Sequence, residues 1–426
     1  MNPLIAVIAD DLTGVCDTGA QFASAGLRTI GSVDPGFKSG DIPHVLLVNT
    51  QSRSLGSGDA SLVVQRAAAG LREFRPKWFF KKIDTALRGH IAVEVVAMME
   101  SLGINTALYA ASIPGAGRTT VNGCQFFHGV PIKESIHGED RLNPNPILTS
   151  SNVDLFAEVP FLETELVRLE EVRSGRLEIS GRMKGLSKKV IILDSETDED
   201  LDRIVEASMK VEPSSFIYVG SFGLSSALGR YLVESLKITK RQRQPLTEKG
   251  LSLDQKRVLI VSGSSHPMAR SQISYLDRRG LIEVVPFQPE DLTGNLGSCI
   301  AKADRAFQAA VGRQKRMALI IGESRSGARR QSQELVTALA KIVRSLLDAD
   351  GVEALVLIGG ETGYEVCRTA GIEAIEILGN ISFVAAYGRP EGSCPKVKLL
   401  ATKGGSLGEE DTVEKMLSFI DLQASQ

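Results

Sequence analysis

Short apolar runs alternate with helical patterns along the first half of the chain. The run at residues 4–8 is apolar at every position, which is typical of a parallel strand buried on both faces. A helical pattern follows it at residues 17–26. Similar apolar runs predict strands at residues 45–48, 78–80, 106–110, 190–193 and 216–219. This alternation of strands and helices predicts an α/β fold.

One predicted helix carries a pair of methionines within an apolar stripe. The apolar side chains of residues 91–102 recur at helical spacing and therefore lie on one face. These residues are Ile91, Val95, Met98, Met99 and Leu102. We interpret the methionines as part of the hydrophobic core and not as cofactor ligands.

A polar stretch at residues 237–256 interrupts the pattern. Beyond it, strands are predicted at residues 257–261, 282–285, 317–321, 354–358 and 397–400, and helices from about residue 267, near residues 301–311 and at residues 335–347. We therefore predict a first domain at residues 1–236, a linker at 237–256 and a second domain at 257–426. The predicted fold class is α/β, with two domains whose mainly parallel sheets are flanked by helices and with a ligand cleft between them.

Residues 112–160 break the rhythm of the first domain, because glycines and prolines interleave there without a clear period. Irregular segments of this length are usually functional or disordered. This one carries polar side chains suited to a ligand: Arg118, Thr119, Thr120, His128, Lys133 and Arg141. We interpret it as a loop that covers a substrate, with disorder as the alternative.

Charge and cysteine content exclude several classes of protein. The 426 residues include 49 basic and 51 acidic ones, so the formal net charge is -2 and offers no field for nucleic acid or an anionic membrane. The amino terminus lacks the pattern of a signal peptide, and no apolar run has the length of a membrane span. We expect a cytoplasmic protein without nucleic-acid or membrane partners. The five cysteines and five histidines show neither a Cys-x-x-Cys pair nor metal-site spacing, so neither disulfides nor zinc are implied.

Polar residues follow three predicted strands of the first domain. Asp10 and Asp11 follow the first strand, residues 51–53 follow the second, and residues 82–88 follow the third. Because the carboxyl ends of parallel strands share one edge of a sheet, we expect carboxylates that bind hydroxyls and guanidiniums that bind a carboxylate to converge there. Two simpler interpretations stay open. One aspartate caps the helix that follows, or Lys82 or Arg88 only pairs with Asp84 at the surface.

Glycine-rich turns follow three predicted strands of the second domain. They lie at residues 262–265, 359–363 and 403–408. Glycine lets the backbone approach a phosphate closely, and the free N–H groups at a helix start favour an anion. Each turn alone is most often only a tight turn, but the three together favour a cradle for nucleotide phosphates. The sequence has no P-loop motif, and no dinucleotide fingerprint opens a helix of the first domain.

These motifs resemble the four-carbon acid sugar kinase family over nearly the whole chain. The matching stretches are ADDLTG at 9–14 with Asp17-Thr18-Gly19, Gln-Ser-Arg at 51–53, Lys-x-Asp-Thr-x-Leu-Arg-Gly at 82–89, Gly-Arg-Thr-Thr at 117–120, Gly-Gly-Glu-Thr at 359–362 and Lys-Gly-Gly-x-x-Gly at 403–408. The resemblance implies a sugar-acid-binding first domain and a nucleotide-binding second domain. It also implies phosphorylation of the terminal hydroxyl of D-threonate, D-erythronate or a 3-oxo-tetronate by ATP with Mg²⁺. Asp17-Thr18-Gly19 resembles the threonate and erythronate branch more than the oxo-tetronate branch.

The chain departs from the family pattern at two places. Where the family has Asp-Ser-Thr-Leu-Arg-Gly-Asn, this chain has Thr85 and Ala86 after the aspartate and ends on His90. Where the family has Phe-Pro before Gly-Arg-Thr-Thr, it has residues 113–116, Ile-Pro-Gly-Ala. A lost hydroxyl partner can change which analogues a site accepts, so the substrate preference of this chain can differ from that of the best-known members.

The candidate site residues follow from the strand ends and the resemblance together. We expect Arg53, Lys82 and Arg88 to hold the substrate carboxylate, and Asp10, Asp11 and Asp84 to bind its hydroxyls. Asp11 is preferred over Asp84 as the base, and the catalytic set is Asp11, Asp84 and Arg88. The full substrate-binding set is Asp10, Asp11, Arg53, Lys82, Ile83, Asp84, Thr85, Arg88 and Arg118. The nucleotide-binding set is Ser262, Ser264, Gly359, Gly360, Glu361, Thr362, Lys403, Gly404 and Gly405. Metal ligands are not assigned, and a homodimer is left open.

Two other classes of function compete with a kinase. A non-catalytic sensor of sugar acids would keep both ligand sites but form no ADP. A dehydrogenase of a sugar acid would bind NADH, which the missing dinucleotide fingerprint argues against. Measured ADP release and a titration with NADH separate the three.

Overall fold

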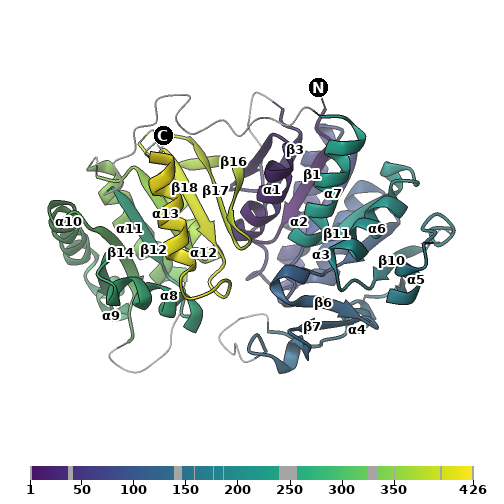
Figure 1. The fold of residues 1–426 in the computed structure, drawn as a ribbon, viewed down its shortest axis with the longest axis horizontal. Coiled ribbons are helices and arrows are strands. Elements are labelled where there is room, and N and C mark those ends of the chain that lie inside the picture. The colour runs from purple at the N-terminus through teal and green to yellow at the C-terminus, as the bar shows by residue number, and fades with distance from the viewer. Residues whose placement is uncertain are drawn as a thin grey trace. The chain divides into compact units, whose positions relative to one another are not determined.

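The computed structural model describes residues 2–36, 42–138, 146–157, 159–175, 177–185, 187–238, 257–324, 333–349, 351–393 and 396–424. The chain forms two compact units, Met1–Lys240 and Arg241–Gln426 (Figure 1). The predicted linker falls mostly outside the described residues. The predicted domain limits and the cleft between the domains therefore stay predictions, and each unit is described by itself.

The first unit is built on a parallel sheet of eight described strands. Their order is β2 (Thr29–Ser32), β3 (Val45–Asn49), β1 (Ile5–Ala9), β4 (Trp78–Lys82), β11 (Phe216–Gly220), β5 (Thr106–Ala110), β10 (Lys188–Leu193) and β9 (Leu162–Val167). Each of the six strands predicted here is confirmed. Strands β2 and β9 were not predicted, because β2 has four residues and β9 carries glutamates at alternate positions along the sheet edge.

Helices flank this sheet on both faces (Figure 1). They are α1 (Leu12–Ala25), α2 (Ser57–Glu73), α3 (Ile91–Leu102), α4 (Asn152–Ala157), α5 (Leu169–Arg173), α6 (Asp198–Ser208) and α7 (Phe222–Ser235). The apolar stripe of α3 is buried, as predicted. Helix α1 begins five residues before the predicted start. Its end is marked by Gly26, whose φ of 115° lies in the left-handed region that glycine adopts readily.

The interpretation of residues 112–160 as an irregular loop is wrong for their described first half. An antiparallel sheet forms there from β6 (Arg118–Val121), β7 (Cys124–Phe127) and β8 (Val130–Pro131), with short 3₁₀ turns η1 (Pro114–Ala116) and η2 (Ile132–Glu134). Gly117, Gly123 and Gly129 have positive φ at the strand junctions, so the glycines mark turns between very short strands. Arg141 lies outside the described residues.

Hydrogen bonds fix this small sheet to the end of β10. The carboxylate of Asp194 accepts from the backbone N–H groups of Asn122, at 2.7 Å, and Gly123, at 2.9 Å. Thr120 and Ser195 exchange backbone hydrogen bonds of 2.9 and 3.0 Å. These hydrogen bonds hold strand β6 beside the carboxyl end of β10.

The second unit holds a mainly parallel sheet of its own. Strands β13 (Ile282–Phe287), β14 (Arg316–Ile321), β12 (Val258–Ser262), β15 (Ala354–Ile358) and β18 (Leu399–Lys403) are parallel in this order. Strands β17 (Ala385–Gly392) and β16 (Ile372–Ser382) continue the order antiparallel. The helices are α8 (Pro267–Arg278), α9 (Pro289–Gly294), α10 (Leu296–Gly312), α11 (Gln333–Asp348), α12 (Gly360–Ala370) and α13 (Thr412–Ala424).

The predicted strands and helices of this unit are confirmed, with one shift. The last parallel strand extends through Lys403, so this lysine ends a strand and does not begin the turn. The hairpin of β16 and β17 was not predicted, because register shifts and polar residues interrupt its alternation. The predicted α/β class with mainly parallel sheets flanked by helices is confirmed.

Each sheet has a topological switch point, where two neighbouring strands connect to later strands on opposite sides of the sheet. In the first unit, β1 leads to β2 on one side and β4 leads to β5 on the other. In the second unit, β12 leads toward β13 and β15 leads toward β16 on the opposite side. Ligands of open α/β sheets bind beyond the carboxyl ends of strands at such points. Apart from Arg118, which lies on β6, the predicted site residues lie at or just beyond the carboxyl ends of these four strands or their neighbours. None of the helices within the described ranges combines the length and apolar character needed to cross a membrane.

Candidate functional site

The two aspartates after β1 share one arginine. Asp10 accepts from Nε and Nη2 of Arg53 at 2.7 and 2.9 Å, and Asp11 accepts from its Nη1 at 2.6 Å. Arg53 follows β3, the neighbour of β1, as the shared strand edge predicts. Its side chain is 21% exposed, whereas those of Asp10 and Asp11 are 5% and 10% exposed. The prediction that these three residues converge is confirmed by this geometry.

Asp11 also caps helix α1, as the simpler interpretation proposed. Its Oδ1 accepts from the backbone N–H of Gly14 at 2.7 Å. This cap explains why α1 starts at Leu12. A carboxylate offers about four lone-pair sites, and the cap and Arg53 occupy two of them. Asp11 therefore keeps capacity to accept a hydrogen bond from a ligand hydroxyl.

The turn after β4 places the next predicted residues. Nε of Arg88 donates to Asp84 at 2.5 Å, so the ion pair of the simpler interpretation exists, but it is partly buried, with the Arg88 side chain 18% exposed and that of Asp84 7% exposed. Nζ of Lys82 donates to the carbonyl of Ile83 at 2.8 Å. The side chain of Ile83 belongs to the hydrophobic core, so this residue contributes only its backbone.

Arg118 reaches the same turn from strand β6. Its Nη1 donates to the hydroxyl of Thr85, and it lies 3.9 Å from Oδ1 of Asp84. Its Nη2 lies 3.3 Å from Nε2 of His137, and its guanidinium carbon lies 6.0 Å from the centre of the Phe127 ring. His137 was not singled out from the sequence, because no periodic or spacing signal marks it.

We call seven of these residues the strand-end cluster: Asp10, Asp11, Arg53, Lys82, Asp84, Arg88 and Arg118. Four of its side chains are basic and three are acidic. Seven charges this close are stable only when they neutralise one another. The cluster carries one cation in excess, which suits an anionic ligand of single charge.

The pKa shifts of Asp10 and Asp84 favour the ionised form of both carboxyl groups. Burial acts to raise the pKa of Asp84, but Arg88, Arg53 and Arg118 hold it well below its usual value. The pKa of Asp10 is also lowered, because Arg53 and two lysines outweigh burial. Burial lowers the pKa of Lys82, and burial lowers that of Arg118 to about 10. Ionised carboxylates are acceptors only, so they suit ligand hydroxyls.

Two glycines let the backbone approach this cluster, a role that the sequence did not reveal. A methyl group at Gly14 would lie 2.9 Å from Oδ1 of Asp11 and 3.3 Å from Cγ of Lys82. A methyl group at Gly89, where φ is +86°, would lie 3.4 Å from Cγ of Arg53. Leu87 also has positive φ, at 60°, although it has a side chain. Strained backbone of this kind gathers at functional sites.

The structure shows the surroundings of Thr85, Ala86 and His90, the residues that depart from the family pattern. Ala86 is fully buried, so a hydroxyl there would need a partner inside the core. The hydroxyl of Thr85 is engaged by Arg118. Nε2 of His90 contacts the carbonyl of Leu55 at 2.7 Å, which joins the turn after β3 to the start of α3.

In the second unit, the three glycine turns contact one another. The backbone N–H of Gly263 donates to the hydroxyl of Thr362 at 3.1 Å, and that of Gly359 donates to the carbonyl of Lys403 at 2.9 Å. A methyl group at Gly405 would lie 2.5 Å from Oγ of Ser264. The strand ends that the sequence singled out therefore do converge on one place in this unit.

Helix α12 begins at this place. Gly359 precedes it with φ 100° and ψ 139°, and no side chain caps its first N–H groups. Gly360 and Glu361 form its first turn, and Thr362 is buried. Lys403 is fully buried, and its Nζ donates to the carbonyl of Gly404 at 2.6 Å. An uncapped helix start beside a lysine and close-packed glycines fits the phosphates of a nucleotide.

The fit for a metal ion differs from the fit for phosphates. Among the described residues, no three acidic, histidine or cysteine side chains form a group that could hold a metal. Mg²⁺ is usually held by one or two carboxylates together with substrate phosphates, and not by a cage of protein ligands. Glu361 is the only carboxylate of the predicted nucleotide-binding set, so the residues fit a metal that arrives with the nucleotide.

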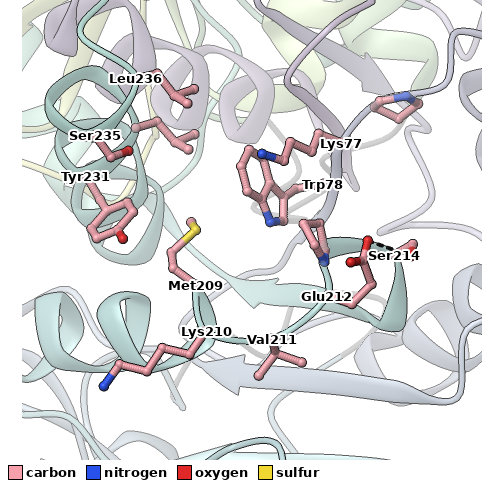
Figure 2. Close-up of a pocket in the computed structure, with 13 residues that line it drawn as sticks. Lys77, Trp78, Met209, Lys210, Val211, Glu212, Ser214, Tyr231, Ser235 and Leu236 are labelled. Carbon is pink, nitrogen blue, oxygen red and sulfur yellow. Dashed lines mark hydrogen bonds between the residues drawn. The ribbon is translucent and has the colours of Figure 1, made fainter.

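A cavity in the first unit lies away from both sets. It has a volume of about 720 Å³ and lies at the amino ends of β4 and β11, lined by residues that include Lys77, Trp78, Met209 and Tyr231 (Figure 2). The strand-end cluster occupies the opposite, carboxyl ends of the same strands. The size of this cavity therefore does not identify the functional site.

Comparison with known families matches both units. A family model described as a sugar-binding N-terminal domain matches residues 5–228, and one described as a nucleotide-binding C-terminal domain matches residues 259–413. The first model covers the strand-end cluster, and the second covers the three glycine turns.

Curated relatives match the chain over nearly its whole length. A D-threonate kinase of Salmonella typhimurium is 30% identical and covers 97% of this chain and 98% of its own length. A D-erythronate kinase of Heliobacterium modesticaldum is 26% identical, with coverage of 98% and 97%. A 3-oxo-tetronate kinase of Pectobacterium atrosepticum is 25% identical, with coverage of 96% and 97%.

Solved structures share the fold. A crystal structure from Salmonella typhimurium LT2 superposes with a TM-score of 0.76 at 19% identity, covering 98% of this chain and 99% of that chain. Haemophilus influenzae protein HI1011 superposes with a TM-score of 0.70, also at 19% identity, covering 97% and 99%. At these identities the likeness shows the fold alone.

Proposed function

Because the chain belongs to the four-carbon acid sugar kinase family, we propose that it transfers the terminal phosphoryl group of ATP to the terminal hydroxyl of a four-carbon sugar acid. D-Threonate and D-erythronate are the proposed substrates, since the two relatives with the highest identity given above act on them by name. A 3-oxo-tetronate is the alternative.

The observation that carries this proposal is the composition of the strand-end cluster. Its carboxylates accept hydrogen bonds from hydroxyls, and its excess cation attracts a carboxylate. A sugar acid has both groups on one short chain. A neutral sugar would leave a buried cation without an anion, which is costly.

Phosphoryl transfer depends on positioning and on charge stabilisation more than on covalent chemistry. We assign Asp11 to accept the proton of the attacking hydroxyl, with Asp84 as the second candidate. Asp10 and Asp84 orient the other hydroxyls, and Arg88 keeps Asp84 in place through its ion pair. The three glycine turns of the second unit bind ATP through backbone N–H groups and Lys403.

Several parts of this proposal rest on the family alone. Mg²⁺ bound to the nucleotide would neutralise the charge that develops on the phosphates. A cytoplasmic location and a homodimer stay predictions, as does the absence of nucleic-acid and membrane partners.

A coupled assay for ADP release tests the proposed function. The chain is mixed with ATP, Mg²⁺ and one member of a panel that includes D-threonate, D-erythronate, their stereoisomers and 3-oxo-tetronates. We expect ADP to form with at least one acid and not with ATP alone. Binding of an acid without ADP formation from any member of the panel would favour the sensor, and tight binding of NADH would favour the dehydrogenase.

A further inference from the structure

We propose that Arg118 binds the carboxylate of the sugar acid, and that Arg53 and Arg88 serve to hold the aspartates. This inference rests on the proposed function and assigns the residue that binds the carboxylate end of its substrate. It replaces the expectation, drawn from the sequence, that Arg53, Lys82 and Arg88 hold this carboxylate.

Among the described residues, no carboxylate accepts a hydrogen bond from Arg118. Its side chain is 4% exposed, and the nearest carboxylate oxygen recorded for it, Oδ1 of Asp84, lies 3.9 Å away. Its two other recorded polar partners, Thr85 and His137, carry no negative charge that could neutralise it. Its Nε has no hydrogen-bond partner within the part of the chain that the structure describes. A buried guanidinium with an unsatisfied donor and a distant anion is an incomplete ion pair, and a bound carboxylate would complete it.

The two other arginines of the cluster contact carboxylates more closely than Arg118 does. Arg53 contacts Asp10 and Asp11 at 2.6 to 2.9 Å, and Arg88 contacts Asp84 at 2.5 Å. Drawing either guanidinium onto a ligand would leave a buried aspartate uncompensated. Nζ of Lys82 lies 2.8 Å from the carbonyl of Ile83. Among the described residues, Arg118 and Lys82 are therefore the two cations of the cluster that donate to no carboxylate. Of the two, only Arg118 offers a planar pair of donors that matches a carboxylate.

Arg118 is also held in position before any ligand arrives. It lies on β6, which Asp194 and Ser195 fix to the end of β10. The rings of Phe127 and His137 pack against each other with centres 4.6 Å apart, and both contact the Arg118 side chain. A preorganised guanidinium loses little conformational entropy when it binds a planar carboxylate.

This placement gives the substrate a direction. The carboxylate lies beside Arg118, Thr85 and Asp84, so the hydroxyl chain extends toward the side of the cluster where Arg53 holds Asp10 and Asp11. Asp11 then faces the terminal hydroxyl, and Asp84 faces an inner one. Asp11, which accepts the proton, and Arg118, which binds the carboxylate, therefore lie at opposite ends of one substrate site.

The test compares D-threonate with threitol, which has the same four-carbon chain but a hydroxymethyl group in place of the carboxylate. Binding is measured by titration calorimetry and turnover by ADP release, for the wild type, Arg118→Gln and Arg118→Lys. Arg230→Gln is the matched control, because Arg230 lies exposed on α7 of the same unit and its ion-pair partner Asp202 is exposed as well. Circular dichroism and the melting temperature report whether each variant folds.

We expect the wild type to prefer D-threonate to threitol by at least ~100-fold, because a site built around a charged group rejects an analogue that lacks it. Arg118→Gln is expected to weaken D-threonate binding by ~100-fold and to leave weak threitol binding nearly unchanged, so the preference collapses. Arg118→Lys should keep part of it, since charge remains but the planar fork is lost. The control should behave as the wild type.

Equal losses for D-threonate and threitol in a folded variant, or no loss for either, would overturn the assignment. A wild type that binds both compounds equally would overturn it as well, even if both Arg118 variants fail to fold. Failure of the proposed function gives a different result, in which D-threonate binds in an Arg118-dependent way but no ADP forms.

Discussion

Asp11→Asn is expected to lower turnover with the best tetronate by at least ~100-fold, the scale on which a positioned general base acts. Asparagine has nearly the shape of aspartate, and its carbonyl oxygen can still accept from the N–H of Gly14, so helix α1 keeps its cap. The amide cannot take the proton of the attacking hydroxyl. The loss should therefore appear in turnover more than in the affinity for the acid, measured by steady-state kinetics and calorimetry.

Asp59→Asn is the matched control, because Asp59 lies exposed in the first turn of α2, outside the cluster. It should leave turnover unchanged. Asp84→Asn, measured alongside, distinguishes the two candidate bases. A normal turnover number for Asp11→Asn together with a large loss for Asp84→Asn would transfer the role of base to Asp84.

Arg88→Ala has the second large expected effect, also a loss of turnover of at least ~100-fold, the scale of a lost charge-stabilising group. Arg88 is the closest partner recorded for Asp84, so its removal leaves a buried carboxylate displaced and undercompensated. Breaking a buried pair in this way can also destabilise the fold, by about 3 kcal/mol. Turnover is therefore measured well below the melting temperature.

The double variant Asp84→Asn with Arg88→Ala isolates the effect on the fold. It removes the uncompensated charge, so we expect the melting temperature to recover. Its turnover should stay low, because Asp84 is also part of the catalytic set. Arg66→Ala, an exposed arginine of α2, controls for the loss of one positive charge. A folded Arg88→Ala variant with the turnover of the wild type would contradict the catalytic assignment of Arg88.

Most of the fold could be predicted, because buried parallel strands are continuous apolar runs. Strands β1 and β15 are buried at every position and apolar throughout, so their runs are visible in the sequence. Strand β9 was not predicted, because glutamates occupy alternate positions along it and interrupt the apolar run. The sheet of β6, β7 and β8 escaped because strands of two to four residues are shorter than any periodicity can reveal.

The site could be predicted in outline but not in its pairing. The rule that ligands bind beyond the carboxyl ends of strands placed Asp10, Arg53 and Asp84 together, and the family resemblance is confirmed by the matching family models. No pattern in the sequence shows that Arg53 donates hydrogen bonds to both Asp10 and Asp11, whereas Arg118 lies 3.9 Å from the nearest carboxylate oxygen recorded for it. Which charges pair depends on the directions of the side chains and on the position of β6 in the folded chain. The spacing of residues along the sequence encodes neither.

The most direct test of the central claim is a crystal structure of the chain with D-threonate and a non-hydrolysable ATP analogue. We predict the phosphates against the turn at residues 359–362 and the sugar acid against Asp10, Asp11 and Asp84. A nucleotide bound elsewhere, for example in the cavity beside Trp78, or a sugar acid away from these aspartates, would contradict the account.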